Sequence, residues 1–210
     1  MSWNWFDFLI MTGAFGSVAV IYYFLTRMNA DGTKKKRDAK NISNAAGSAL
    51  AATKRFAAMQ HFEVIAPAHL AKNGKFADLD FILVGCFGLL CVKCVGLGGE
   101  IYGSASDAKW LQVTGGERIP FDNPIQQAAA DTRLVRDALF TAKMKNVNVE
   151  TVCVFTNRKA QLSLPRSTGH YTLKDYRALL GKDRLRAEKN VDIAKAAAAV
   201  RAYLAPAQDE

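Results

Sequence analysis

The sequence predicts a mixed α/β domain that follows one N-terminal transmembrane helix. Two observations predict the domain: apolar strands flank a glycine turn at residues 85–88, and a helical period of apolar residues begins after Asn123. A third observation, an uncharged run of nineteen residues over 8–26, predicts the transmembrane helix. Half of the 210 residues are apolar, so the chain can bury a sizeable core in one domain.

The uncharged run is long enough to cross a bilayer, because a helix of that length at about 1.5 Å per residue covers roughly the 30 Å hydrocarbon core. Asp7 precedes the run and Arg27 follows it, whereas a cleaved signal peptide carries its positive charge before the apolar run. We therefore expect residues 1–27 to be an uncleaved, single-pass anchor in the cell membrane. The positive charge after the run places the N-terminus outside and the domain in the cytoplasm.

Residues 28–41 form a polar segment without an apolar period, and we interpret them as a linker. About two thirds of the net charge of +9 lies between Arg27 and Arg55, a stretch that contains the cluster Lys34, Lys35, Lys36 and Arg37. Near an anionic leaflet each basic residue contributes on the order of 1 kcal/mol of attraction. A basic run is also typical of nucleic-acid binding, but its place directly after the apolar run favours a membrane-proximal role.

The apolar strands 80–84 and 89–95 are expected to pair as an antiparallel hairpin. Glycines at both ends of the turn supply the backbone angles that a short connection requires. A turn centred between Cys86 and Phe87 places Asp80 opposite Lys93 on one face of the hairpin. We therefore expect an acid and a base to form a pair inside an apolar sheet, with the Lys93 ammonium at hydrogen-bond distance from Asp80.

Cys91 and Cys94 match the pattern C-x-x-C in the second of these strands. Residues three apart on a strand point to opposite faces, so the two thiols are not expected to converge on a metal or a redox centre. We expect buried, reduced cysteines that pack as small hydrophobic side chains, which is consistent with the cytoplasm.

The remaining elements follow from apolar periods, caps and glycine turns. The predicted domain spans residues 42–182, and a C-terminal helix and tail span 183–210. The expected elements are a helix over about 42–59, strands over 62–70, 101–102, 110–113 and 150–155, a helix from the Asn123 cap to before 146, a short helix from Thr172 to Gly181, and a last helix with Ile193, Ala197, Val200 and Leu204 on one face.

This order of elements resembles the nuclease-related domain family, NERD, of the restriction-endonuclease-like superfamily. The resemblance covers residues 47–155, and the order and spacing of its motifs make it specific. They are Asp80 in DLDFILVG, the Phe87-Gly88 turn, Gly99 with Ile101-Tyr102-Gly103, Trp110, and Asn123-Pro124-Ile125-Gln126-Gln127. The resemblance implies a restriction-endonuclease-like mixed sheet flanked by helices.

The resemblance also implies a catalytic set of an Asp, a Glu-x-Lys pair, a helix Glu and a Gln. Asp80 and Gln127 match the family's Asp and Gln. Lys93 stands at the position of the Glu in Glu-x-Lys, Val95 stands at that of its Lys, and Ser48 lies near that of the helix Glu. One carboxylate facing an ammonium group is a poor site for Mg²⁺, which requires oxygen ligands and negative charge.

We therefore expect a membrane-anchored domain with a degenerate site that binds nucleic acid or a protein partner, without a metal or small-molecule cofactor. One alternative is a Mg²⁺-dependent nuclease whose carboxylate comes from another position, such as Glu63 or Glu100. A second alternative is a membrane-tethered scaffolding module without a role in nucleic-acid binding.

Overall fold

The computed structural model describes residues 46–205. The predicted anchor (1–27) and the predicted basic linker (28–41) lie outside the described residues. Within 46–205, no helix combines the length and the apolar character that crossing a bilayer requires.

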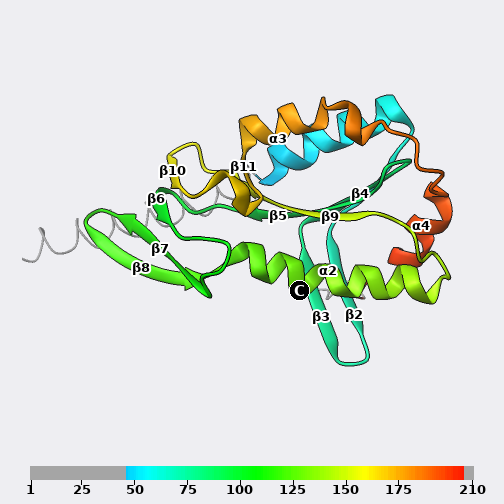
Figure 1. Cartoon of the computed structure of the whole chain (residues 1–210), viewed down its shortest axis with the longest axis horizontal. Coiled ribbons are helices and arrows are strands. Elements are labelled where there is room, and N and C mark those ends of the chain that lie inside the picture. Colours follow the sequence, from blue (N-terminus) through cyan, green and yellow to red (C-terminus); the bar gives the residue numbers. More distant parts are fainter. Residues whose placement is uncertain (1–45, 206–210) are drawn as a thin grey trace, which may run out of the picture. The chain divides into compact units, whose positions relative to one another are not determined.

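The centre of the domain is a five-stranded mixed sheet (Figure 1). In spatial order its strands are β1 (Glu63–Ile65), β4 (Phe81–Gly85), β5 (Gly88–Val95), β9 (Val149–Phe155) and β11 (His170–Thr172). β1, β4 and β5 pair antiparallel, while β9 is parallel to both β5 and β11. The predicted hairpin is confirmed: Gly85 faces Gly88, and Phe81 faces Val92.

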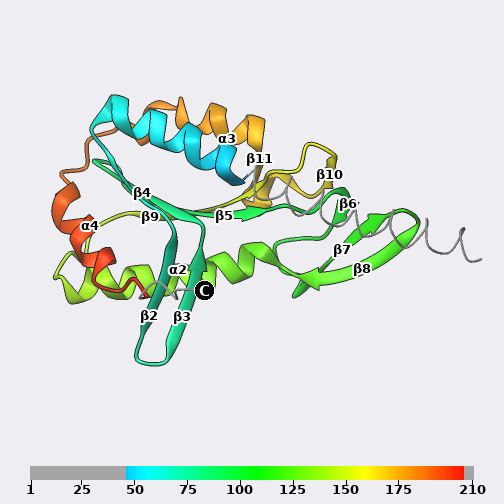
Figure 2. The ribbon, with the colours of Figure 1, turned by 180° about the vertical axis from the view of Figure 1, so that it is seen from behind.

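Helices cover both faces of this sheet, which confirms the predicted mixed α/β architecture (Figures 1 and 2). The first helix, described over residues 46–60, and α3 (Leu173–Leu180) lie on one face. On the opposite face lie α2 (Pro124–Thr141) and α4 (Ile193–Arg201). The predicted caps are present, because Asn123 accepts from the Ile125 N–H at 2.9 Å and Thr172 from the Asp175 N–H at 3.1 Å.

Two smaller sheets extend from the central one. The first has the order β10 (Ala160–Ser163), β6 (Gly99–Tyr102), β7 (Lys109–Thr114) and β8 (Glu117–Asp122). Trp110 joins it to the central sheet by stacking on Phe155, with ring centroids 6.3 Å apart. The second sheet is the hairpin of β2 (Ala68–Lys72) and β3 (Lys75–Leu79). The 3₁₀ turns are η1 (Arg166–Thr168) and η2 (Asp183–Leu185).

The structure corrects the strand predicted over residues 62–70. That segment is split into β1 and β2 at the cis peptide bond between Ala66 and Pro67, because proline has no N–H to donate to a strand ladder. The strands β3, β8, β10 and β11 were not predicted from the sequence. Gly115 and Gly116 form the turn that joins β7 to β8.

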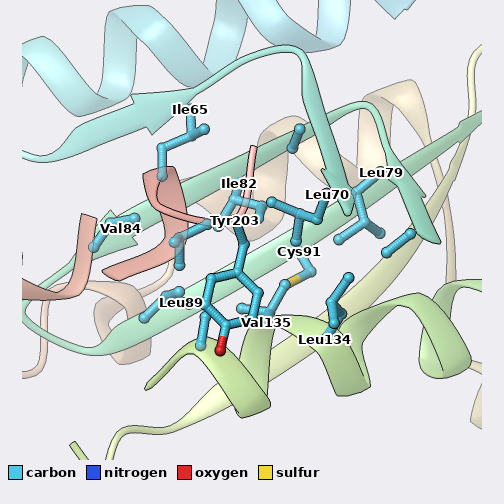
Figure 3. Packing of buried hydrophobic residues seen from close by; sticks show 14 of the residues in the cluster. Ile65, Leu70, Leu79, Ile82, Val84, Leu89, Cys91, Leu134, Val135 and Tyr203 are labelled. Carbon is cyan, nitrogen blue, oxygen red and sulfur yellow. The ribbon is translucent and has the colours of Figure 1, made fainter. Parts of the chain in front are cut away.

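The main hydrophobic core lies between the central sheet, the β2–β3 hairpin, α2 and α4 (Figure 3). Side chains from six elements gather there with Tyr203: Ile65, Leu70, Leu79, Ile82, Cys91 and Val135. Ala197 and Val200 bring α4 into the same core. The β2–β3 hairpin is therefore fixed against α2, and this contact positions the polar residues at its base.

Candidate functional site

The candidate site lies where β3 leads into β4, opposite the end of β5. Asp80 occupies the predicted position there, since the register of the hairpin sets it across from Lys93 and its N–H donates to Val92 O at 3.0 Å. The Asp80 carboxylate accepts the Cys94 N–H at 2.7 Å. One carboxylate oxygen is therefore already held by the backbone of the facing strand.

Lys93 does not bond to Asp80, and the predicted direct pair is wrong. Its ammonium group donates to the Asp78 carboxylate at 2.5 Å and to the Asp78 carbonyl oxygen at 2.5 Å. The lysine side chain therefore reaches Asp78 at the end of β3. The Lys93 side chain is 19% exposed and that of Asp78 is 69% exposed, so the pair lies at the edge of the buried region.

His69 completes the surroundings of Asp78. It faces Asp78 across the β2–β3 hairpin, and its Nδ1 lies 2.8 Å from Asp78 Oδ1. Both carboxylate oxygens of Asp78 therefore have a partner, one the imidazole of His69 and the other the ammonium group of Lys93.

Asp131 on α2 is a third carboxylate near Lys93. Burial raises the pKa of Asp131 above its usual value, while the Asp78 backbone N–H and the charge of Lys93 act in the opposite direction. Asp80 behaves in the same way, because burial raises its pKa while the Cys94 N–H and Lys93 oppose the shift. The pKa of Asp78, by contrast, is lowered, chiefly by the hydrogen bond from Lys93. The charge of one ammonium group therefore lowers the pKa of three carboxyl groups relative to burial alone.

The donor set of this cluster does not fit Mg²⁺. The ion requires near-octahedral oxygen ligands at about 2.1 Å. The oxygens of Asp78 already hold two nitrogen groups, and one oxygen of Asp80 holds a backbone N–H. Within residues 46–205, no three or more His, Cys, Asp or Glu side chains form a group that could hold a metal ion.

The other residues that the resemblance selected do not take part in the Lys93 cluster. Gln127 is exposed one turn before Asp131 on α2, and its side-chain amide has no hydrogen-bond partner in the described part of the chain. Val95 is half-buried and packs against the small core around Trp110. Ser48 lies on the first helix, on the other face of the central sheet.

The two glutamates considered as relocated carboxylates have partners of their own. Glu63 forms an ion pair with Arg201 at 2.7 Å. Glu100 accepts the Tyr102 hydroxyl at 2.6 Å. Besides Asp80, the carboxylates near Lys93 are Asp78 and Asp131, which were not predicted from the sequence.

The cysteines are free thiols, as expected. Cys91 packs in the core beneath α2, whereas Cys94 packs on the side of the first helix and α3, so the C-x-x-C pair points to opposite faces. Burial raises the pKa of Cys91 and of Cys153 to about 12, which keeps both thiols protonated at neutral pH.

The protein is a mixed α/β domain whose central antiparallel hairpin carries an acid and a base on one face. A family model described as the nuclease-related domain, NERD, matches residues 43–156, which is more than half of the chain. The chain belongs to this family. The comparison with curated proteins and the comparison with solved structures each give no match. The matched segment includes the whole Lys93 cluster, from His69 to Asp131.

Proposed function

We propose that the protein is a membrane-anchored, cytoplasm-facing NERD domain that binds nucleic acid and does not cleave it by a metal-dependent route. One observation carries the proposal: the Lys93 ammonium group, bonded to Asp78 at 2.5 Å, stands where the resemblance implies a metal-binding carboxylate. A fixed positive charge there compensates the buried carboxylates in place of a divalent cation.

The surface beside this cluster supports nucleic acid as the ligand. A pocket of about 490 Å³ is lined by the bases Lys75 and Arg133, by the acids Asp131 and Asp137, and by Phe76, which is 79% exposed. Basic groups bind backbone phosphates, and an exposed aromatic ring offers a base a stacking surface.

The test measures the affinity of the purified full chain for a fluorescent oligonucleotide over a series of salt concentrations. We expect affinity to fall steeply with salt, because each phosphate contact contributes about 0.7 to 0.9 to the logarithmic slope. Lys75→Gln with Arg133→Gln should reduce that slope by about 1 to 2. The control, Lys174→Gln with Lys182→Gln, removes the same charge from the α3 side of the sheet and should leave the slope nearly unchanged.

The same preparation separates this proposal from its rivals. One rival is a metal-dependent nuclease, and cleavage in Mg²⁺ or Mn²⁺ that Asp80→Ala abolishes would establish it. An affinity for nucleic acid that does not respond to salt, together with a retained protein partner, would instead favour a scaffolding module.

The proposed orientation has its own test, which rests on the apolar run and the basic cluster of the linker. A reporter fused to the C-terminus should be protected from protease added outside intact cells. Replacing Lys34, Lys35, Lys36 and Arg37 by glutamine should expose the reporter in part of the population, because the charge bias that orients the helix is reduced. Full accessibility of the unaltered protein would contradict the orientation.

A further inference from the structure

A second pocket lies on the opposite side of the central sheet from Lys93, between the first helix, α3 and the segment after η2. Its volume is about 530 Å³. Three arginines line it, Arg55, Arg177 and Arg186, and each comes from a different one of these elements. The fold therefore gathers charges that lie far apart in the sequence.

The first helix contributes a row of regularly spaced side chains to this pocket. Ser48, Ala52, Arg55 and Met59 recur at intervals of four, three and four residues, which places them on one stripe of a helix. Phe56 and Leu180 line the pocket as well, and both are almost fully buried. The pocket therefore combines an apolar wall with a cationic rim.

The charges of this rim are not balanced by the protein. None of the residues that line the pocket is acidic. In the part of the chain that the structure describes, Arg55 and Arg177 form no ion pair, and Arg186 meets only Asp183, at 3.7 Å. The Asp183 side chain is fully exposed, so water weakens that pair. Three guanidinium groups around one cavity repel each other, and an anion between them would relieve the repulsion.

The arrangement selects the kind of anion. The planar, forked guanidinium group matches two oxygens of a phosphate at once. The C-terminal end of α3 carries a partial negative charge of about one half, which opposes an anion, but three full positive charges outweigh it. Met59, 64% exposed at the rim, would be covered by an apolar part of the ligand.

We propose that this pocket binds an organic phosphate, a phosphoryl group held by the three arginines and carried on an apolar body that covers Met59. A lipid headgroup and a soluble phosphate ester share this chemistry. The inference is independent of the proposed nucleic-acid surface, because that surface lies on the α2 face.

The test titrates the purified full chain with phenyl phosphate and with inorganic phosphate in a calorimeter. We expect phenyl phosphate to bind at least about fivefold more tightly than inorganic phosphate, because only phenyl phosphate has an apolar ring that can cover Met59. The variant Arg55→Gln, Arg177→Gln, Arg186→Gln should lose about tenfold or more of the affinity for both probes. The control Lys54→Gln, Lys174→Gln, Lys182→Gln removes equal charge from neighbouring positions that do not line the pocket, and it should bind within about twofold of the unaltered chain.

A further variant separates the apolar contribution to binding from that of the phosphate, and a second measurement distinguishes a lipid headgroup from a soluble ester. Met59→Ala should weaken phenyl phosphate binding and leave inorganic phosphate binding unchanged. Native mass spectrometry with phosphatidic acid, phosphatidylcholine and AMP then identifies the source, since a lipid site retains phosphatidic acid and a site for soluble esters retains AMP. Equal affinity of the arginine and lysine variants, or no binding of any phosphate, would overturn the proposal.

Discussion

Gly88→Ala should destabilise the domain by about 3 kcal/mol or more, the largest effect we expect from a single methyl group. Gly88 has a φ of 123°, a conformation that side chains rarely adopt. A Cβ atom there would lie 2.2 Å from the carbonyl oxygen of Asn148. That oxygen also accepts the Leu89 N–H at 2.8 Å, at the start of the pairing between β5 and β9. Neither backbone can move aside without opening the central sheet.

Gly74→Ala is the matched control, because Gly74 also has a positive φ, 72°, and also lies in a hairpin turn. A Cβ atom at Gly74 would meet nothing within 4 Å. We expect it to cost only about 1 kcal/mol, the price of the backbone conformation alone. Urea unfolding of the full chain measures both variants. Equal losses would show that the backbone conformation decides the effect and that the contact with Asn148 does not.

The hairpin at the centre of the site was predictable because its determinants are local. Two glycines bracket a turn of fixed length, and the length of a turn fixes which residues face each other. The position of Asp80 across from Lys93 follows from that register. The helix α2 was equally predictable, from the Asn123 cap, Pro124 and a sustained apolar period.

The partner of Lys93 was not predictable because it lies on a strand that the sequence analysis did not assign. With the first strand extended across Pro67, no strand was predicted between residues 70 and 80, so Asp78 could not be placed opposite another residue. The structure places Asp78 at the end of β3, facing His69. Two features of the sequence pointed there: proline interrupts a strand ladder, and Asp78 stands two residues before Asp80.

Asp131 was missed for a different reason. Its helix was predicted correctly, but the periodic pattern identifies only the apolar stripe and does not say which polar residue beside it lies near another element. That depends on how α2 packs against β3, a contact between separate parts of the chain. Asp131 follows Gln127 by one helical turn, so the resemblance already marked the correct face of the helix.

Lys93→Met should destabilise the domain by about 2 kcal/mol at neutral pH and by much less in acid. Methionine retains the apolar stem but removes the charge that three carboxylates share. Breaking a buried ion pair costs about 3 to 5 kcal/mol. The expected value is smaller because Asp78 is 69% exposed and water can replace part of the lost partner.

The direction of the pH dependence follows from the three pKa shifts. The lowered pKa of Asp78 stabilises the fold at neutral pH, and this contribution is lost as the pH falls through the folded-state pKa. The raised pKa values of Asp80 and Asp131 penalise the fold at neutral pH, and protonation removes the penalty in acid. Without Lys93 all three pKa values rise, so the stability lost in the variant is greatest above them and shrinks as the carboxyl groups protonate.

Urea unfolding of the full chain at about pH 7 and about pH 4.5 measures this difference. Lys109→Met is the control, because Lys109 is exposed on β7 and forms no ion pair within residues 46–205; it should change stability by no more than about 0.5 kcal/mol at either pH. Adding Asp78→Asn to Lys93→Met should restore part of the loss at neutral pH, since it removes one uncompensated carboxylate. A loss that is equal at both pH values, and that Asp78→Asn does not relieve, would show that Lys93 contributes through packing and hydrogen bonding to the Asp78 carbonyl, and that the shared-charge account of the cluster is wrong.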